Sequence, residues 1–288
     1  MGQLLISGLA IGCIYSLASL GFVITYKSVG ILNFAYGEMV SVGAYLAATF
    51  VVSVGVPLVM GLVLVLIAMV GVGVAFAYGV YNPLRNKPVR TVVMATIGVS
   101  IALQALMLLL WGPYPKSLPV LGSTSPIHLG DTAILPHNIY IFGFTIVSVA
   151  LLYLLYGRTS VGWRMQAVAQ DAEAARLMGI NVTSIIVITW VLSAMFAGLA
   201  GFLLAPLFFI TTSVGFAVML KAFAACIIGG FGSLEGAIVG GLFVGVAESL
   251  LAGYVSTAYK DVLTFGVLIA ILILMPQGLF GEKIGEKV

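Results

Sequence analysis

Charged residues are scarce in this chain, and their scarcity excludes most soluble folds. Asp, Glu, Lys and Arg make up 7% of the 288 residues, whereas hydrophobic residues make up 62%. Soluble globular domains carry about 25% charged residues, so this composition predicts an integral membrane protein. The basic residues lie mainly between the apolar runs. The formal net charge of +3 therefore indicates membrane topology and predicts no nucleic-acid partner.

The side chains that commonly build enzyme sites are also few. Cys13 and Cys226 lie in apolar runs, which is typical of packing residues and not of a disulfide or metal framework. His128 and His137 share one loop with Asp131, without a Cys or a carboxylate cluster to complete a metal site. No GxxxxGK[ST] phosphate loop occurs. We therefore expect no enzyme activity, metal or cofactor in this chain.

Long apolar runs are what the chain has instead. The run "VLVLIAMVGVGVAFAYGVY" is continuously apolar and as long as a membrane span, whereas a β-barrel would alternate in polarity. We predict an all-α polytopic membrane protein, with one transmembrane domain over 1–288 and eight to nine transmembrane or re-entrant helices. The expected spans are about 3–25, 31–54, 57–80, 92–111, 138–156, 184–205, 215–231, 236–253 and 262–275. The seventh and eighth are short and Gly-rich, either full spans or half-helices that turn back.

Basic residues predict the orientation. If the segments after the first, third, fifth and ninth spans are cytoplasmic, they hold nine of the 12 basic residues, namely Lys27, Arg85, Lys87, Arg90, Arg158, Arg164, Arg176, Lys283 and Lys287. Lys116, Lys221 and Lys260 remain toward the other side. The excess of Lys and Arg on the cytoplasmic side of membrane proteins predicts an outside N-terminus and a cytoplasmic C-terminus.

Two loops are longer than connectors need to be. The outer one, 112–137, is rich in Pro, Gly and Ser, and we expect a small external cap. In the inner one, 157–182, the sequence predicts a helix from Trp163 to Met178. Thr159 or Ser160 would cap its start, and Gly179 would end it. This helix either rests on lipid or docks on a protein. Its mixed charges favour docking, because a lipid-binding face is mainly basic.

Two segments of the chain resemble each other. "SLASLGFVITYKSVGILNFA" (16–35) and "AGLAGFLLAPLFFITTSVGFA" (197–217) share Leu-Ala, Gly-Phe and Ser-Val-Gly in the same order. With the expected topology they run in opposite directions, as in the inverted repeats of transporters whose pathway lies between the two halves. The candidate pathway residues beside these segments are Asn33, Tyr36, Glu38 and Lys221, because charged groups within a membrane usually face a partner, water or a pathway. Glu38 either contacts the solute or bonds a neighbouring helix.

Glycines in the same regions have two possible roles. The first is close helix packing, through small-xxx-small pairs such as Gly236 and Gly240. The second is an unwound hinge at the pathway. The candidate packing or hinge glycines are Gly37, Gly229, Gly230, Gly232 and Gly236. Packing is the favoured role in general, and the first four of these are the better candidates for an unwound backbone.

Three stretches resemble one known family. They are "GLAIGCIYSLASLGFVITYKSVGILNFAYGEMVSVGAYLA" (8–47), "LKAFAACIIGGFGSLEGAIVGGLFVG" (220–245) and "MPQGLFGEK" (275–283). They resemble the membrane permeases of branched-chain amino acid ABC importers, the LivH type, over essentially the whole chain. The inner loop resembles the coupling segment of that family, with Gly162, Arg164, Ala167, Ala169, Ala175, Gly179 and Ile180 in the matching places. Tyr36 stands where such permeases often have His, and Met165 and Gln166 follow Arg164 where many have a shorter basic-Ala pattern.

The resemblance implies a permease subunit in a bacterial inner membrane that forms half of a pathway for branched-chain or similar small amino acids. It implies a second, homologous permease, two cytoplasmic ATPase subunits that bind ATP and Mg, an extracytoplasmic solute-binding protein and surrounding lipid as partners. The residues expected to couple to the ATPase are Gly162, Arg164, Ala167, Asp171, Glu173, Arg176 and Gly179.

Three alternatives remain open at this point. Relatives of this permease type also serve urea and short amides. An ion-coupled secondary transporter, with Glu38 or Glu248 as the proton-linked group, would have the same inverted repeat and intramembrane carboxylates. A membrane scaffold that transports nothing would leave the repeat unexplained.

Overall fold

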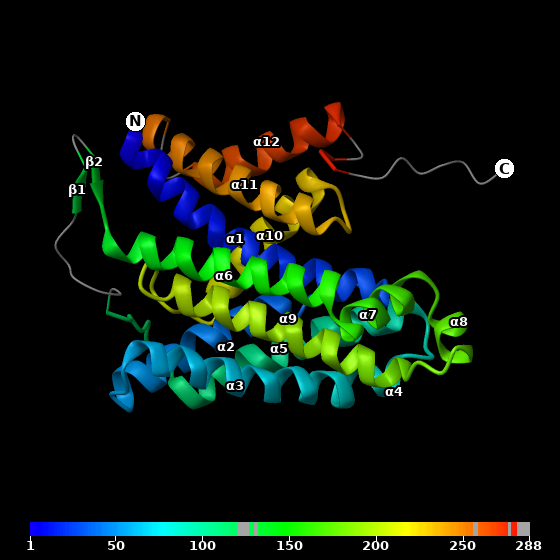
Figure 1. Cartoon of the computed structure of the whole chain (residues 1–288). Coiled ribbons are helices and arrows are strands. Elements are labelled where there is room, and N and C mark those ends of the chain that lie inside the picture. The colour runs from blue at the N-terminus through cyan, green and yellow to red at the C-terminus, as the bar shows by residue number, and fades with distance from the viewer. Residues whose placement is uncertain (120–126, 130–131, 256–258, 276–277, 281–288) are drawn as a thin grey trace.

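Nine apolar helices form an elongated bundle in this computed structural model, which describes residues 1–119, 127–129, 132–255, 259–275 and 278–280 (Figure 1). Within those residues the apolar helices are α1 Gly2–Val29, α2 Tyr36–Ala48, α3 Leu58–Phe76, α5 Val89–Trp111, α6 Pro136–Arg158, α9 Val182–Leu204, α10 Val214–Gly229, α11 Leu234–Tyr254 and α12 Lys260–Leu274. A π-helical turn, Thr49–Ser53, extends α2, and a second, Ala77–Tyr81, joins α3 to the short α4, Asn82–Leu84. The expected all-α polytopic fold is confirmed.

Six of these helical segments are long and apolar enough to cross a membrane: α1, α3 through α4, α5, α6, α9 and α11. Helices α2, α10 and α12 are shorter, at 13, 16 and 15 residues. Of the two spans left open by the sequence, the eighth is thus a full-length helix and the seventh is a short one. Mean hydropathy of +1.22 over the chain agrees with this architecture.

A short hairpin interrupts the helices at one end of the bundle. Strands β1 (Ile127–Leu129) and β2 (Thr132–Ile134) pair antiparallel, with Ile127 opposite Ile134, and lie beside the N-terminus (Figure 1). The same loop is tied to the segment before α10, because the backbones of Lys116 and Ile210 exchange two hydrogen bonds of 3.1 and 2.8 Å. Asp131 lies outside the described residues.

Glycines allow α1 to lie against α11 at the centre of the bundle. A Cβ added at Gly12 would lie 2.8 Å from Leu242 Cα, and one at Gly8 would lie 2.9 Å from Ser249 Cβ. The two backbones therefore approach more closely than any larger residue allows. By contrast, α3, α5 and α6 expose apolar side chains such as Leu109, which is 83% exposed. Those outer faces fit a hydrocarbon surrounding.

The expected second span, 31–54, is wrong at its start. Gly30 adopts a left-handed backbone (φ 69°) and ends α1, and α2 begins only at Tyr36. Asn33 organises the non-helical turn between them: its Oδ1 accepts from Ala35 N at 3.0 Å and its carbonyl accepts from Tyr36 N at 3.3 Å. Such side-chain bonds to the local backbone compete with helix formation. The expected unwound backbone at Gly37 is also wrong, since Gly37 lies within α2.

The inner loop forms two helices where the sequence predicted one. These are α7 (Ser160–Gln170) and α8 (Ala172–Leu177). Asp171 breaks the helix, because its backbone is extended and its Oδ1 accepts from Glu173 N and Ala174 N at 2.9 Å each, which starts a new helix. The expected cap at Thr159 and the left-handed end at Gly179 (φ 82°) are confirmed.

The two halves of the bundle run in opposite directions. In Figure 1, α1 starts at the hairpin end and α9 starts at the end where α7 and α8 lie, and each is followed by a non-helical segment and a shorter helix, α2 or α10. This is the arrangement expected of an inverted repeat. The Ser-Val-Gly motifs are not equivalent within it, however, since 28–30 end α1 and 213–215 begin α10.

The described ends of the chain lie at opposite ends of the bundle. Met1 is at the hairpin end (Figure 1), whereas Leu279 N donates to Ile228 O at 2.8 Å, in the last turn of α10. The loop that follows α10 lies near the end of α1, because the rings of Phe231 and Tyr26 are 4.4 Å apart. An odd number of crossings, on which the predicted orientation depends, is consistent with this placement.

Candidate functional site

The Glu38 side chain of α2 is buried against α5, where its hydrogen-bond partner lies far away in the sequence. The carboxylate is fully buried, and Oε1 accepts from Gln104 Nε2 at 2.6 Å. Oε2 is also buried, and no described residue donates a hydrogen bond to it. An ionised carboxylate offers about four acceptor positions, and an unsatisfied buried polar atom is costly. Oε2 of Glu38 therefore keeps acceptor capacity that no described residue uses.

Polar contacts hold α5 to α2 along its length. Thr96 Oγ1 accepts from Phe34 N at 3.2 Å, and Trp111 Nε1 donates to Thr49 Oγ1 at 2.7 Å. Thr96, Ser100 and Gln104 follow at four-residue spacing on one face of α5, and Thr96 and Ser100 are buried. We call this contact, formed by Phe34, Glu38 and Thr49 with Thr96, Ser100, Gln104 and Trp111, the α2–α5 seam. The sequence prediction missed its α5 side, although a polar stripe in an apolar helix was a readable signal.

Tyr36 and Asn33 belong to different surroundings. The Tyr36 ring contacts Phe22 of α1 edge-on, with ring centroids 5.9 Å apart, and its hydroxyl is buried without a described partner. Residues two apart point to nearly opposite sides of a helix, so Tyr36 faces α1 while Glu38 faces α5. Asn33 forms the turn before α2, and its Nδ2 is buried without a described partner. The structure thus does not gather the expected pathway residues around Glu38.

Lys221 lies in a second polar cluster, between α10, α11, α12 and α1. Its Nζ is 2.6 Å from Glu248 Oε1 and 3.0 Å from Asp261 Oδ1, and Tyr15 donates to Glu248 Oε2 at 2.7 Å. We call these four residues the Lys221 cluster. Glu38 is not among its contacts, so the two charged groups predicted for one pathway lie in separate clusters. Glu248 could be identified from the sequence as a charge within a membrane helix. The contacts of Tyr15 and Asp261 with this cluster could not be predicted, because these residues are far from one another along the chain.

The pathway glycines act mainly by close packing. A Cβ at Gly37 would lie 2.8 Å from Gly215 O, so α2 and α10 touch there backbone to backbone. Gly229 and Gly236 make the same kind of contact between α10 and α11. Gly230 and Gly232 differ, because their φ angles of 103° and 94° build the turn between those two helices. The expected unwound backbone thus lies at Gly230 and Gly232, while Gly229 is the last residue of α10.

The expected coupling residues divide between a packed helix and an exposed one. Gly162, Met165 and Val168 bury one face of α7, and a Cβ at Gly162 would lie 2.6 Å from Tyr156 Cα of α6. Ala167 is half-buried. The exposed members are Arg164, Asp171, Glu173, Arg176 and Gly179. Gly162 therefore seats α7 on the bundle, and the residues free to meet a partner lie mostly on and around α8.

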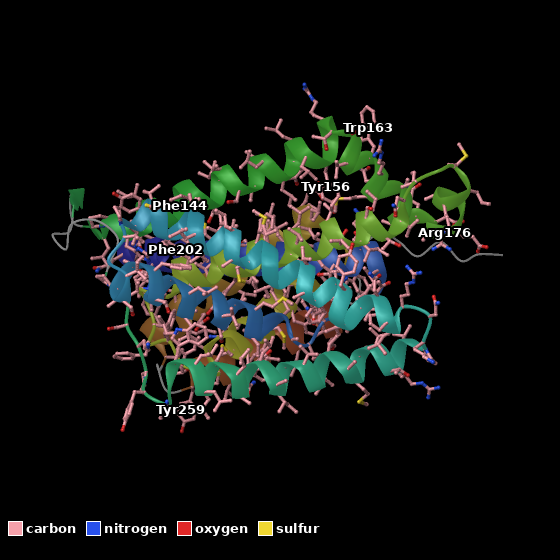
Figure 2. All side chains as sticks on the ribbon, turned by 90° about the horizontal axis from the view of Figure 1, so that it is seen from below. Phe144, Tyr156, Trp163, Arg176, Phe202 and Tyr259 are labelled. Carbon is pink, nitrogen blue, oxygen red and sulfur yellow. The ribbon has the colours of Figure 1, made fainter. Side chains whose placement is uncertain are left out.

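The end of α8 carries two exposed apolar side chains that the sequence prediction did not single out. Leu177 is 85% exposed and Met178 is 83% exposed. The chain reverses directly after them, because Gly179 N donates to Arg176 O at 3.0 Å and Ile180 N donates to Ala175 O at 3.0 Å. Figure 2 shows Arg176 at the far end of the molecule, away from the main bundle. Leu177 and Met178 thus form an apolar tip on a projecting loop.

The histidines and cysteines form no site among the described residues. His137 is fully buried in α6, where its Nε2 lies 3.1 Å from Leu203 O of α9. Cys13 and Cys226 are buried and free, as expected of packing residues. No group of three or more His, Cys, Asp or Glu side chains in the described part of the chain is arranged to hold a metal ion.

Comparison with known proteins agrees with this architecture. The family model described as "Branched-chain amino acid transport system / permease component" matches residues 4–272. The chain is 34% identical to the high-affinity branched-chain amino acid transport system permease protein LivH of Escherichia coli, over 99% of this chain and 97% of that one. It is 35% identical to the permease protein BraD of Pseudomonas aeruginosa, with the same coverage.

One solved structure shares the fold at low sequence identity. It is a metal-chelate type ABC transporter in an inward-facing conformation, 15% identical, with a TM-score of 0.53 over 93% of this chain and 85% of that one. This likeness concerns the fold alone. The family match over nearly the whole sequence agrees with a multi-pass permease. The chain belongs to the family of permease components of branched-chain amino acid transport systems.

Proposed function

We propose that this chain is one of two homologous permease subunits that form the pathway of an ABC importer for branched-chain or similar small amino acids. The observation that carries the proposal is the α7–α8 loop, on which the neighbouring side chains of Leu177 and Met178 are both exposed. Exposed apolar patches mark contacts with proteins or membranes, and the mixed charges of Arg164, Glu173 and Arg176 around this patch favour a protein over lipid. A carrier driven by an ion gradient has no need of such a contact. Two separate ATPase subunits would bind ATP and Mg, since this sequence has no phosphate loop.

Coupling would run from α8 through α7 into the bundle. Helix α7 is fixed to α6 at Gly162, where no side chain fits between the backbones, and its Met165 is fully buried. A displacement of α8 by a closing ATPase pair would therefore move α7 and α6 together, as packed elements shift in domain closure. Asp171 caps α8, so its role would be to position that helix. Arg164, Glu173 and Arg176 would surround the apolar tip with charges.

We assign the solute pathway to the α2–α5 seam. Glu38 keeps one buried oxygen without a described partner, and a carboxylate held in this way inside a membrane is suited to a passing ammonium group. Gln104 holds the other oxygen and fixes the direction of the carboxylate. Contacts of α5 with α2 are partly polar, so this helix can shift without opening an apolar core. The second permease would complete the pathway.

The orientation follows from the basic residues. Lys27, Arg85, Arg158 and Arg176 belong to the same end of the bundle as α7 and α8, and Lys116 belongs to the hairpin end. The Lys and Arg bias supports a cytoplasmic position for α7 and α8 and an outside N-terminus. An extracytoplasmic binding protein would then meet the hairpin end.

Reconstitution tests the proposal. The chain would be assembled in liposomes with a candidate homologous permease, ATPase pair and binding protein, and uptake of labelled leucine would be followed, with labelled urea as the comparison solute. We expect leucine uptake only with ATP inside the liposomes and binding protein outside. Uptake without ATP, or uptake that stops when the proton gradient collapses while ATP remains, would support the secondary transporter instead. Uptake of urea but not leucine would move the substrate class to urea and amides.

A further inference from the structure

A groove of about 240 Å³ lies on the outside of the bundle, between α3 and α6, with α9 as its floor. Figure 1 shows α9 between these two helices. Leu66 of α3 forms one wall, Leu151 and Leu155 of α6 form the other, and Leu192 and Leu199 of α9 lie along the floor. Leu151 is 60% exposed, so the groove opens outward. It is separate from the α2–α5 seam and from the Lys221 cluster.

The groove is apolar and lies within membrane-spanning helices. Ser148 is the single polar side chain among the described residues that line it. Such a site does not bind an ordered water, because a buried water needs two to four polar partners. All three helices are long and apolar enough to cross a membrane, so the open side of the groove lies at the depth of the acyl chains. A single extended chain fits a groove of this shape, which follows the helix axes for roughly 10 Å from Leu192 to Leu199.

A basic side chain follows the groove toward one end of the bundle. Arg158 is exposed and lies three residues after Leu155 and seven after Leu151, on the same face of α6. Trp163, 63% exposed, lies just beyond it on α7, and Figure 2 shows both Trp163 and the end of α6 at the margin of the bundle. Basic side chains at the ends of membrane helices bind lipid headgroups, and Trp is enriched at the level of the headgroups.

We propose that the groove between α3, α6 and α9 is a binding site for one acyl chain of a bilayer phospholipid, with the lipid phosphate paired to Arg158. The apolar walls hold the chain, and the guanidinium selects an anionic headgroup, since Arg binds phosphate through two parallel hydrogen bonds. The bound lipid fills the space between α6 and α3. It thereby joins the helix that carries α7 to the outer wall of the bundle.

Lipid retention by the purified full-length chain tests this site. Native mass spectrometry in detergent would count the lipids retained after titration with phosphatidylglycerol, an anionic lipid, or phosphatidylethanolamine, a zwitterionic one. We expect one tightly retained lipid with a preference for phosphatidylglycerol. Ser148→Trp fills the groove and should weaken its retention by at least about tenfold. Ile146→Trp is the matched control, because Ile146 is 67% exposed on the same helix and does not line the groove.

Arg158→Gln separates the headgroup from the chain and does not depend on how Ser148→Trp folds. Arg158 is exposed at a helix end, so this variant should keep its fold and its bound lipid but lose the preference for phosphatidylglycerol. Equal retention by Ser148→Trp and Ile146→Trp would overturn the proposal. An unchanged preference in Arg158→Gln would overturn the pairing with phosphate. A cross-link from position 151 to a second permease would also overturn it, since protein would then cover the groove.

Discussion

The Lys221 cluster and the α2–α5 seam both bury ionisable side chains among membrane helices, yet they satisfy them differently. In the Lys221 cluster both oxygens of Glu248 are bonded, one to Lys221 Nζ and one to the Tyr15 hydroxyl. In the seam Glu38 has one bonded oxygen and one that no described residue contacts by a hydrogen bond. Because unpaired charge is expensive in a membrane, we interpret the closed network as structural, and our proposal assigns the open one to a passing solute.

The difference shows that a charge in a membrane helix does not by itself mark a pathway. Lys221 and Glu38 looked alike in the sequence, as lone charges in related Gly-rich segments. Their partners distinguish them. The contacts of the Lys221 cluster join four helices, whereas the hydrogen bond of Glu38 joins two helices and leaves one carboxylate oxygen unbonded among the described residues. The predictions below ask whether stability and transport divide between the two regions in the same way.

Removing the cation of the Lys221 cluster should have the largest effect on stability. Lys221→Met removes the ammonium group that contacts the buried Glu248 carboxylate and Asp261, and breaking a buried ion pair from one side costs about 3 kcal/mol or more. We expect a clearly lower thermal unfolding midpoint in detergent, measured by intrinsic fluorescence. Lys87→Met, in an exposed loop, should leave the midpoint unchanged. Equal midpoints for the two variants would show that the closed network is not structural.

Separating α10, which carries Lys221, from α2, which carries Glu38, should have the next largest effect. A Cβ at Gly215 would lie 2.6 Å from Ser41 Oγ and would overlap the Gly37 backbone, so Gly215→Ala forces α10 away from α2. Overpacking of this kind costs about 1–3 kcal/mol. Gly143→Ala in α6 is the control, because nothing lies near its added methyl, and it should be neutral or stabilising by up to about 1 kcal/mol. Similar destabilisation by both variants would argue against a tight α2–α10 contact.

Neutralising the open carboxylate should affect transport more than stability. Glu38→Gln retains an acceptor for Gln104, so we expect less than about 1 kcal/mol of change in unfolding free energy. Uptake by the reconstituted complex should nevertheless fall at least about tenfold, if the lost charge served the pathway. Normal transport combined with a lower unfolding midpoint would make Glu38 a structural residue.

Gln104→Leu is the companion variant for Glu38. It removes the hydrogen bond that fixes the carboxylate and leaves the charge in place. We expect weaker transport that the conservative change Gln104→Asn partly restores, because only the direction of the carboxylate has been lost. A transport rate equal to that of the unmodified chain would exclude a positioning role for Gln104.

Changing the tip of α8 should have the smallest effect on stability. Leu177 is 85% exposed, so Leu177→Asp should alter the unfolding free energy by less than about 0.5 kcal/mol. Copurification with the ATPase subunits should be lost, because the apolar tip would become charged. Leu177→Met keeps an apolar side chain and should copurify at the original stoichiometry. Undiminished ATPase binding by Leu177→Asp would move the docking surface away from this tip.

Sequence patterns anticipated the elements better than their ends. Continuous apolar runs predicted nearly every membrane helix, since the run itself drives a helix into hydrocarbon. The start of α2 and the break at Asp171 were missed for one physical reason: at Asn33 and Asp171 a side chain bonds the local backbone in place of the helix. Polar residues of that kind are common within helices and at caps alike, so their type alone does not decide which of the two occurs.

The candidate site was likewise predictable only in part from the sequence. Glu38 could be found from the sequence because a lone carboxylate in an apolar run is conspicuous, but Gln104, 66 residues away, could be matched to it only through the packing of α5 on α2. The coupling loop was likewise located by composition and resemblance, whereas the burial of Gly162 and the exposure of Leu177 depend on how α7 folds against α6.

Composition and the order of the apolar residues determined that this chain lies in a membrane as a bundle of helices. The 62% hydrophobic and 7% charged residues predict a membrane protein, and the continuous apolar runs predict helices, since the strands of a β-barrel would alternate in polarity. The tertiary structure decided which buried charges are satisfied. Lys221 contacts Glu248 and Asp261 across helix contacts that no spacing along the chain encodes, whereas among the described residues Glu38 bonds Gln104 through one oxygen and leaves the other unbonded. Hydropathy is a property of each residue and can be read in order, whereas the pairing of charges depends on distances of a few ångström that exist only after the helices pack.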